Sequence, residues 1–260
     1  FVGLNAVRDA AGAHPFVEAL TALATDVRSV LGYSTTLTYG ADWSEWFGHR
    51  PADGSGDVIF HLDPLWASPA IDVVGIDAWF PLTDWRRGDH LDAALADRVT
   101  DRDHLDGRIE GGENFDWYYA SPADRLAQIR TPIVDAAYGE DWIFRPKDLR
   151  GWWANPHHDR PGGVRSATPT AWVPGSKPIW LTELGCPAVD LGSNEPAAFF
   201  DPKSSESRAP VFSAGTRDDF LQRRTLEVIL DHWNPALNPE RNPLSATGVR
   251  MLPLDGIHLW

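Results

Sequence analysis

The sequence predicts an α/β fold built on a parallel sheet. Short apolar runs near residues 71–80, 177–183 and 256–260 alternate with segments of helical periodicity. The run at 177–183 ends on a carboxylate, Glu183, before Gly185 and Pro187 break the strand pattern. Because chemistry in (β/α)8 barrels is carried at the carboxyl ends of strands, these observations favour a (β/α)8, TIM-barrel-like architecture.

The stretch KPIWLTELGCP, Lys177–Pro187, is the strongest strand signal. Pro178 to Leu181 form the apolar run of a buried strand, and Glu183 follows at its end. A carboxylate there is costly, because desolvation opposes its charge. Two interpretations follow: a reactive group in a barrel mouth, or a structural Glu paired with an Arg under a loop.

The first part of the chain alternates helix and strand. A helix is predicted from Pro15 to Leu31, with Pro early in its first turn and Gly32 at its end. Residues 35–39, rich in Thr and Tyr, predict a strand, and residues 58–66 a partly helical segment. The apolar run 71–80 predicts the next strand, stopped by Pro81.

The middle of the chain interrupts this rhythm. Residues 82–176 are polar and aromatic, with short helices expected near 121–129 and 146–154, and we interpret them as an inserted lid or subdomain. A helix is expected at 216–233, with Thr216 and Asp219 as its capping box. The predicted organisation is therefore residues 1–81, the insertion 82–176, and residues 177–260 with the last strands.

Four or five strands are visible, whereas a closed barrel needs eight. We therefore expect this chain to be the C-terminal half of a barrel, strands 5–8, with the insertion between strands 6 and 7. The competing interpretation is a small open sheet that is complete in itself. Because the chain starts at Phe1 rather than Met, we also expect it to be a processed or excised segment.

Composition excludes several classes of function. With 23 Lys and Arg against 37 Asp and Glu, the net charge is −14, which argues against a nucleic acid or anionic membrane as the main partner. Cys186 is the only cysteine, so internal disulfides and thiolate clusters are excluded. No apolar run approaches a membrane span. His157 and His158 have no supporting ligands nearby in sequence, so we expect neither a metal site nor a cofactor.

Aromatic and acidic residues supply the candidates for chemistry. The chain has 13 Trp, which stack on sugar rings or fill cores. Two interpretations are open for one group of aromatic residues: a wall that stacks on sugar rings, or packing of the insertion onto the barrel. The group is Trp117, Tyr118, Tyr119, Trp142, Trp152 and Trp153. Retaining glycoside hydrolysis needs a second carboxyl group about 5–5.5 Å from the first. If Glu183 is the nucleophile, the partner candidates are Asp42, Glu45, Asp77, Glu113 and Glu140.

Longer strings of residues carry two resemblances to known families. YGADWSEW, LDPLWASPAIDVVGIDAWFPL and KPIWLTELGCP resemble the strand ends of (β/α)8 retaining glycoside hydrolases of the β-mannanase-like branch. GENFDWYYAS, WWANPHHDRPGG, TPTAWVPGSKPIW and FFDPKSSES resemble the TIM-barrel-like domain of gene transfer agent and phage tail proteins. The second resemblance covers nearly the whole chain.

The resemblances imply roles for particular positions. Glu183 matches the nucleophile, on the seventh strand, and Trp260 matches a sugar-stacking Trp on the eighth. Asp77 and Trp79 fall on the sixth strand, and Asp42 and Trp43 just after the fifth; apart from Glu183, these are the expected substrate-binding residues. Relatives often have Tyr at the position of Trp79, where a hydroxyl bonds the nucleophile. The acid/base Glu is expected immediately before Phe1, outside the chain.

The implied function is a glycoside-hydrolase-like domain of a phage-tail or gene-transfer-agent tail-tip protein. It would hydrolyse or engage a cell-surface polysaccharide or cell-wall glycan at the exterior of a target cell, beside other tail or baseplate subunits. The alternative is a non-catalytic glycan-binding or structural baseplate module. Turnover is left open, because the expected acid/base Glu is not in the sequence.

Overall fold

The computed structural model describes residues 3–199, 201, 203–205 and 207–260. These residues form two compact units, each assembled from separate stretches of the chain. Unit 1 comprises the residues up to Asp77 together with Arg150–Thr182 and Pro243–Ile257. Unit 2 comprises Ala78–Leu149, Glu183–Asn242 and His258–Trp260. The boundaries predicted at 82 and 177 stay a prediction.

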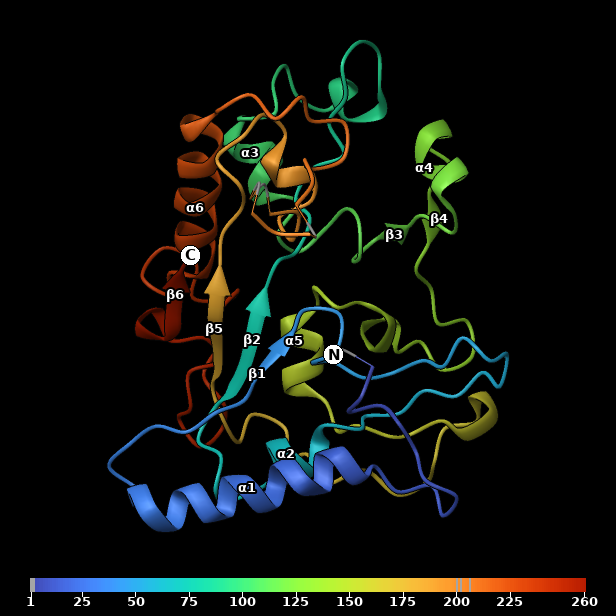
Figure 1. The fold of residues 1–260 in the computed structure, drawn as a ribbon, viewed down its shortest axis with the longest axis vertical. Helices are drawn as coiled ribbons and strands as arrows, with labels where there is room; N and C mark the ends of the chain where they lie inside the picture. The colour runs from blue at the N-terminus through green and yellow to red at the C-terminus, as the bar shows by residue number, and fades with distance from the viewer. Residues whose placement is uncertain (1–2, 200, 202, 206) are drawn as a thin grey trace. The chain divides into compact units, whose positions relative to one another are not determined.

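The main sheet has four strands in the order β1-β2-β5-β6 (Figure 1). They are β1 (Gly40–Asp42), β2 (Val74–Ala78), β5 (Ile179–Leu184) and β6 (Ile257–Leu259). β1 and β2 pair in parallel, with Gly40 opposite Gly75 and Asp42 opposite Asp77. A second, antiparallel pair joins β3 (Trp117–Tyr118) to β4 (Thr131–Pro132). The prediction of an α/β fold with a parallel sheet is confirmed.

β1 begins later than the sequence predicted. The segment 35–39 is not a strand, and the ladder starts only at Gly40. Side chains take the place of ladder hydrogen bonds before that point: Leu37 N donates to the Asp72 carboxylate at 2.7 Å, and Thr38 Oγ1 donates to Val73 O at 2.8 Å. Strand propensity alone could not reveal this competition. As a result, Asp42 lies in the strand rather than in the loop after it.

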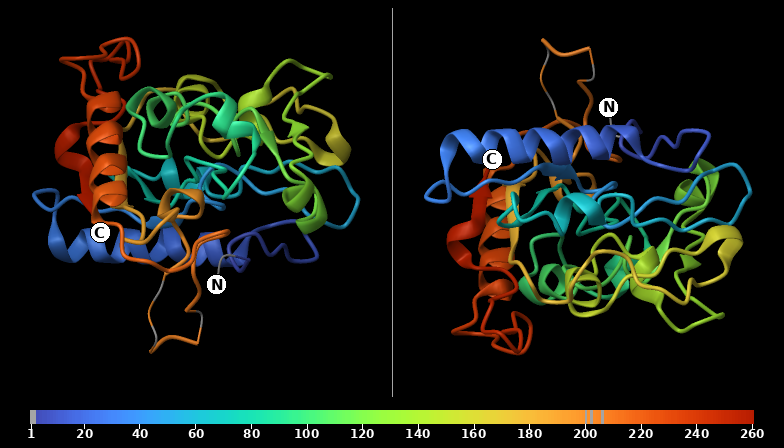
Figure 2. Two further views of the ribbon diagram at one scale, coloured as in Figure 1. Left: turned by 90° about the horizontal axis from the view of Figure 1, so that it is seen from above. Right: turned by 90° about the horizontal axis from the view of Figure 1, so that it is seen from below.

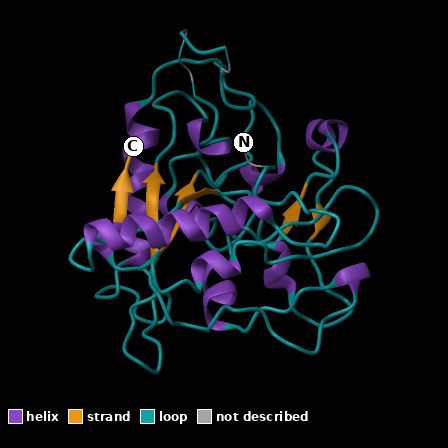
Figure 3. Cartoon of the chain, turned by 60° about the horizontal axis from the view of Figure 1, so that its bottom comes forward, coloured by secondary structure: helices purple, strands orange, loops and turns teal. Residues whose placement is uncertain are grey.

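Among the described residues, five α-helices overlap the segments where helix was predicted, whereas α3 was not predicted. The α-helices are α1 (Pro15–Leu31), α2 (Asp63–Trp66), α3 (Arg102–Asp106), α4 (Pro122–Ala127), α5 (Leu149–Ala154) and α6 (Asp219–Trp233). Single 3-10 turns cover Leu91–Ala94, Asp141–Phe144, Pro161–Gly163, Gly192–Asn194 and Leu254–Gly256. α1 is uninterrupted along its length (Figure 2), whereas loops and turns occupy much of the rest (Figure 3). The 22 Gly and 21 Pro account for that loop content.

The cap of α6 differs from the predicted one. Asp218 is the N-cap, and its carboxylate accepts a hydrogen bond from Leu221 N at 2.9 Å. Thr216 lies outside the helix, where its N–H donates to Asp190 Oδ1 at 2.7 Å. The predicted capping box of Thr216 and Asp219 was therefore wrong, because the loop carboxylate of Asp190 draws Thr216 away from the helix.

An aromatic cluster with one buried histidine forms the core of unit 1. His157 is fully buried, and its ring stacks on Phe60 at 4.4 Å between centroids. Its Nδ1 lies 2.8 Å from Asp63 Oδ2, and its Nε2 donates to Trp152 O at 2.9 Å. Trp152 in turn packs against Trp46, with ring centroids 4.8 Å apart. Both ring nitrogens of His157 are thus committed to holding the core together.

The aromatic residues of the predicted insertion divide between two roles. Trp142, Trp152 and Trp153 are buried, which is the packing interpretation. Trp153 also donates from Nε1 to Lys177 O at 2.7 Å, next to the start of β5. Trp117 and Tyr119 are half-buried, and Tyr118 is exposed. Arg130 lies over the Trp117 ring and Arg125 over the Tyr119 ring, so these two rings are packed as well.

Lys147 is the fully buried lysine of unit 2. Its ammonium donates to Pro81 O and Gly111 O, each at 2.8 Å, and so ties two loops together. Burial lowers the pKa of Lys147 to about 7, with partial compensation by the charge of Glu113. The folded protein therefore holds this amine close to its titration point at neutral pH.

We predict that the free energy of unfolding rises as pH increases from about 7 toward about 10.4, the pKa of an unperturbed lysine. In that window the unfolded chain binds a proton at Lys147 that the folded chain releases. Urea denaturation at several pH values should show this rise flattened in Lys147→Met. Lys203→Met is the control, because Lys203 is exposed. An unchanged slope in Lys147→Met would contradict the prediction.

Candidate active site

The carboxylate of Glu183 lies at the end of β5 in unit 2. Ile179 and Leu181 earlier in the strand are buried, whereas Glu183 is half-buried. Trp79 Nε1 donates to Glu183 Oε2 at 3.1 Å. Among the described residues, Glu183 forms no ion pair. The site therefore does not support the interpretation in which an Arg neutralises a structural Glu.

Trp79 positions the Glu183 side chain. The indole is buried directly after β2, and its ring meets Phe199 edge-to-face at 4.8 Å between centroids. Phe199 holds the ring plane, and the N–H then fixes one carboxylate oxygen. The indole N–H of Trp79 therefore orients the Glu183 carboxylate.

The chain around Trp260 lies against the same strand end. Trp260 N donates to Leu184 O at 2.9 Å. A Cβ on Gly185 would lie 2.8 Å from Trp260 O and 3.4 Å from the Trp79 ring, so glycine is required for this close approach. The Trp260 side chain is 70% exposed and is available to stack on a ligand.

Unit 1 carries two neighbouring carboxylates, Asp42 and Asp77, which are opposite each other in the ladder. Asp77 Oδ1 accepts a hydrogen bond from Thr182 Oγ1 at 2.7 Å. Burial raises the pKa of Asp77; the Thr182 hydroxyl opposes this shift and the charge of Asp42 adds to it. Asp42 instead accepts from Ser44 N at 2.8 Å, and the half-buried Trp43 lies in the turn that Asp42 begins.

A buried polar network next to β1 was not predicted. Glu45 is 4% exposed, and Tyr39 Oη donates to its Oε2 at 3.3 Å while accepting from Asn5 Nδ2 at 2.9 Å. His61 Nε2 lies 3.7 Å from the other Glu45 oxygen. Burial and the charge of Glu45 raise the pKa of Tyr39. Only the polar loop at residues 40–46 hinted at this network, because Asn5 and His61 are distant in sequence.

The remaining carboxylate candidates lie in unit 2. Glu113 is buried and forms a bidentate ion pair with Arg125, which assigns it a structural role. Glu140 is half-buried beside Asp135, whose Oδ2 accepts from Glu140 N at 3.0 Å. Neither contact places Glu113 or Glu140 next to Glu183.

The parallel sheet and its alternation with helices define an α/β domain. The chain belongs to the family of GTA TIM-barrel-like domains, where GTA stands for gene transfer agent, and the family model matches residues 1–260. A search of curated proteins gave no match.

The expectation that the chain is only the C-terminal half of a barrel is not supported, because the family domain extends over all 260 residues. The four strands of the main sheet agree with the four or five counted in the sequence, and β1 and β6 are only three residues long. Within the part of the chain that is described, no helix has both the length and the apolarity that a bilayer crossing demands.

We predict that Asp77→Asn reduces the pH dependence of stability above about pH 4. Because the folded pKa of Asp77 is raised, its contribution to stability is present at lower pH and is lost as pH rises through the folded pKa. The amide oxygen still accepts from Thr182, so the fold should persist. Unfolding followed from pH 3 to 7 in wild type, Asp77→Asn and the exposed control Asp89→Asn tests this; identical profiles would refute it.

Proposed function

We propose that this domain acts on a cell-surface polysaccharide or cell-wall glycan during attachment of a gene-transfer-agent or phage-like particle. Family membership supports the association with gene transfer agents. The observation that carries the proposed chemistry is the hydrogen bond from Trp79 to Glu183, in which a strand-end carboxylate receives an N–H rather than a cation. A carboxylate held in this way is not committed to an ion pair.

In the proposed reaction, one Glu183 oxygen attacks the anomeric carbon of the sugar. The bond from that carbon to the glycosidic oxygen breaks, and the leaving oxygen takes a proton from a second carboxylic acid. Water, deprotonated by that second group, then attacks the same carbon and releases Glu183, so configuration is retained. Trp79 would hold the Glu183 oxygen in line, and the exposed Trp260 ring would stack on the sugar.

The remaining candidates take supporting roles in this proposal. Asp42, Trp43 and Asp77 at the end of the β1-β2 pair would contact the substrate through hydrogen bonds and stacking. The Asp77 carboxyl group, whose pKa is raised, is the donor among them best suited to hold a proton. The domain would work at the exterior of the target cell, together with other tail or baseplate subunits.

In the full-length protein, Glu183→Gln is predicted to abolish release of reducing ends from capsule or wall polysaccharide, because an amide is too weak a nucleophile. Wild type and Glu18→Gln, which changes an exposed carboxylate on α1, should release them at equal rates. Equal release by wild type and Glu183→Gln would eliminate Glu183 as nucleophile. Glycan binding without release by any variant would instead support a non-catalytic binding module.

Trp79→Phe is predicted to slow the same reaction about 10- to 100-fold, because a hydrogen bond to a charged group is worth roughly 1.5–3 kcal/mol. The phenyl ring should keep the contact with Phe199, so the melting temperature should change little. The loss should appear in kcat rather than in KM. An unaltered kcat would show that the indole N–H has no part in catalysis.

A further inference from the structure

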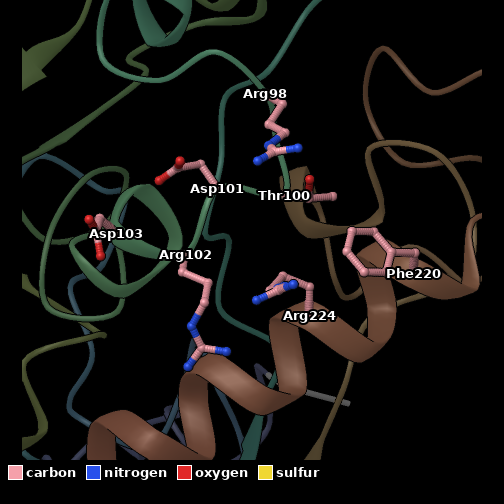
Figure 4. Close-up of a pocket in the computed structure, with 7 residues that line it drawn as sticks. All are labelled: Arg98, Thr100, Asp101, Arg102, Asp103, Phe220 and Arg224. Atoms are coloured by element: carbon pink, nitrogen blue, oxygen red, sulfur yellow. The ribbon is translucent and has the colours of Figure 1, made fainter.

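A separate cavity of about 380 Å³ lies in unit 2 between the start of α3 and the first turns of α6 (Figure 4). Arg98, Arg102 and Arg224 contribute to its lining, together with the ring of Phe220. Its volume is at the lower end of the range of about 300–1,000 Å³ found for small-molecule sites. Three arginines around one cavity are unexpected in a chain with a net charge of −14.

The arginines differ in how their charges are satisfied. Arg102 is paired with Asp231 at 2.5 Å, and Glu227 forms its shortest ion pair, 2.7 Å, with Arg223. Arg224 approaches Glu227 only at 4.0 Å, and its buried Nε has no hydrogen-bond partner. The guanidinium of Arg98 has no ion pair among the residues that the structure describes. Two of the three cations therefore retain unused donors.

The nearby acidic side chains do not fill this deficit. Asp101 caps α3, accepting from His104 N at 3.0 Å. Figure 4 shows its carboxylate and that of Asp103 turned away from the guanidinium groups of Arg98 and Arg224, which extend toward the same space. A ligand entering that space meets the guanidinium donors of Arg98 and Arg224, whereas the carboxylates of Asp101 and Asp103 lie elsewhere along the lining.

Phe220 adds an apolar surface to this charged site. Its side chain is 54% exposed, and the guanidinium of Arg224 lies over the ring at 5.2 Å. The Thr100 hydroxyl, which also lines the cavity, both donates and accepts hydrogen bonds. An acidic sugar is complementary to these features. Its carboxylate matches the guanidinium groups, its hydroxyls match Thr100, and its C–H face matches the ring of Phe220.

We propose that this cavity binds an acidic sugar unit, with its carboxylate between Arg98 and Arg224 and its ring against Phe220. Planar guanidinium groups bind carboxylates through paired, charge-assisted hydrogen bonds, and the C–H face of a sugar packs on an aromatic ring. Thr100 bonds a ring hydroxyl. The site is distinct from Glu183 and requires no hydrolysis there, so it adds a place for a charged glycan to be held.

The test is an NMR titration of the full chain with glucuronate at low ionic strength, with glucose as the uncharged control and inorganic phosphate as the free anion. Glucuronate should bind saturably at millimolar concentration, shifting the Thr100 and Phe220 resonances, and glucose should not. The double variant Arg98→Gln/Arg224→Gln should bind at least about tenfold more weakly. Arg217→Gln should bind normally, because Arg217 is exposed and paired with Asp219 outside the cavity.

The variant Phe220→Ala distinguishes binding of an acidic sugar from binding of a free anion. It should weaken glucuronate binding and leave phosphate binding unchanged. Absence of saturable glucuronate binding, or equal binding by the double variant, overturns the proposal; phosphate binding as tight as glucuronate binding, unaffected by Phe220→Ala, overturns the sugar assignment. Glu183→Gln should bind glucuronate as wild type does, so a failure of the hydrolase proposal is distinguishable. The shifts in wild type report the site even if a variant fails to fold.

Discussion

A carboxylate that ends a buried strand must be stabilised by something, and here an indole N–H does so. The bond from Trp79 to Glu183 satisfies one oxygen without neutralising the charge, and Phe199 fixes the indole in turn. If an arginine were the partner of Glu183, as Arg125 is the partner of Glu113, the carboxylate would have a structural role. The functional interpretation of the strand end depends on this choice of partner.

The structure holds its other buried polar groups in different ways. His157 and Asp63 pair inside an aromatic core, and Lys147 is held by carbonyl oxygens without a close carboxylate. Asp84 forms an ion pair with Arg130 at 3.0 Å, and this pair connects two segments of the irregular chain after β2. Specific polar contacts of this kind replace long regular elements in holding the loop-rich segments.

Local signals predicted the elements that are governed by local physics, whereas long-range contacts decided the rest. The helix α1 and the strand β5 formed where their end signals and apolar runs placed them, but β1 was displaced by hydrogen bonding to Asp72. Glu183 and Trp79 were identifiable because each stands at a strand end, where topology gathers side chains. Arg98 and Arg224 line the same cavity although they are far apart in sequence. No local periodicity predicts that two such residues lie near each other.

The distribution of amines has a practical consequence. The sequence has three lysines, and Lys147 is enclosed while the Lys177 ammonium donates to Trp66 O and Ser68 O at 2.6 Å each. Lys203 alone presents its side chain openly. Among the lysine side chains, coupling to an activated ester would thus concentrate on one loop of unit 2, giving a defined point for tethering the domain to a bead or a fluorophore.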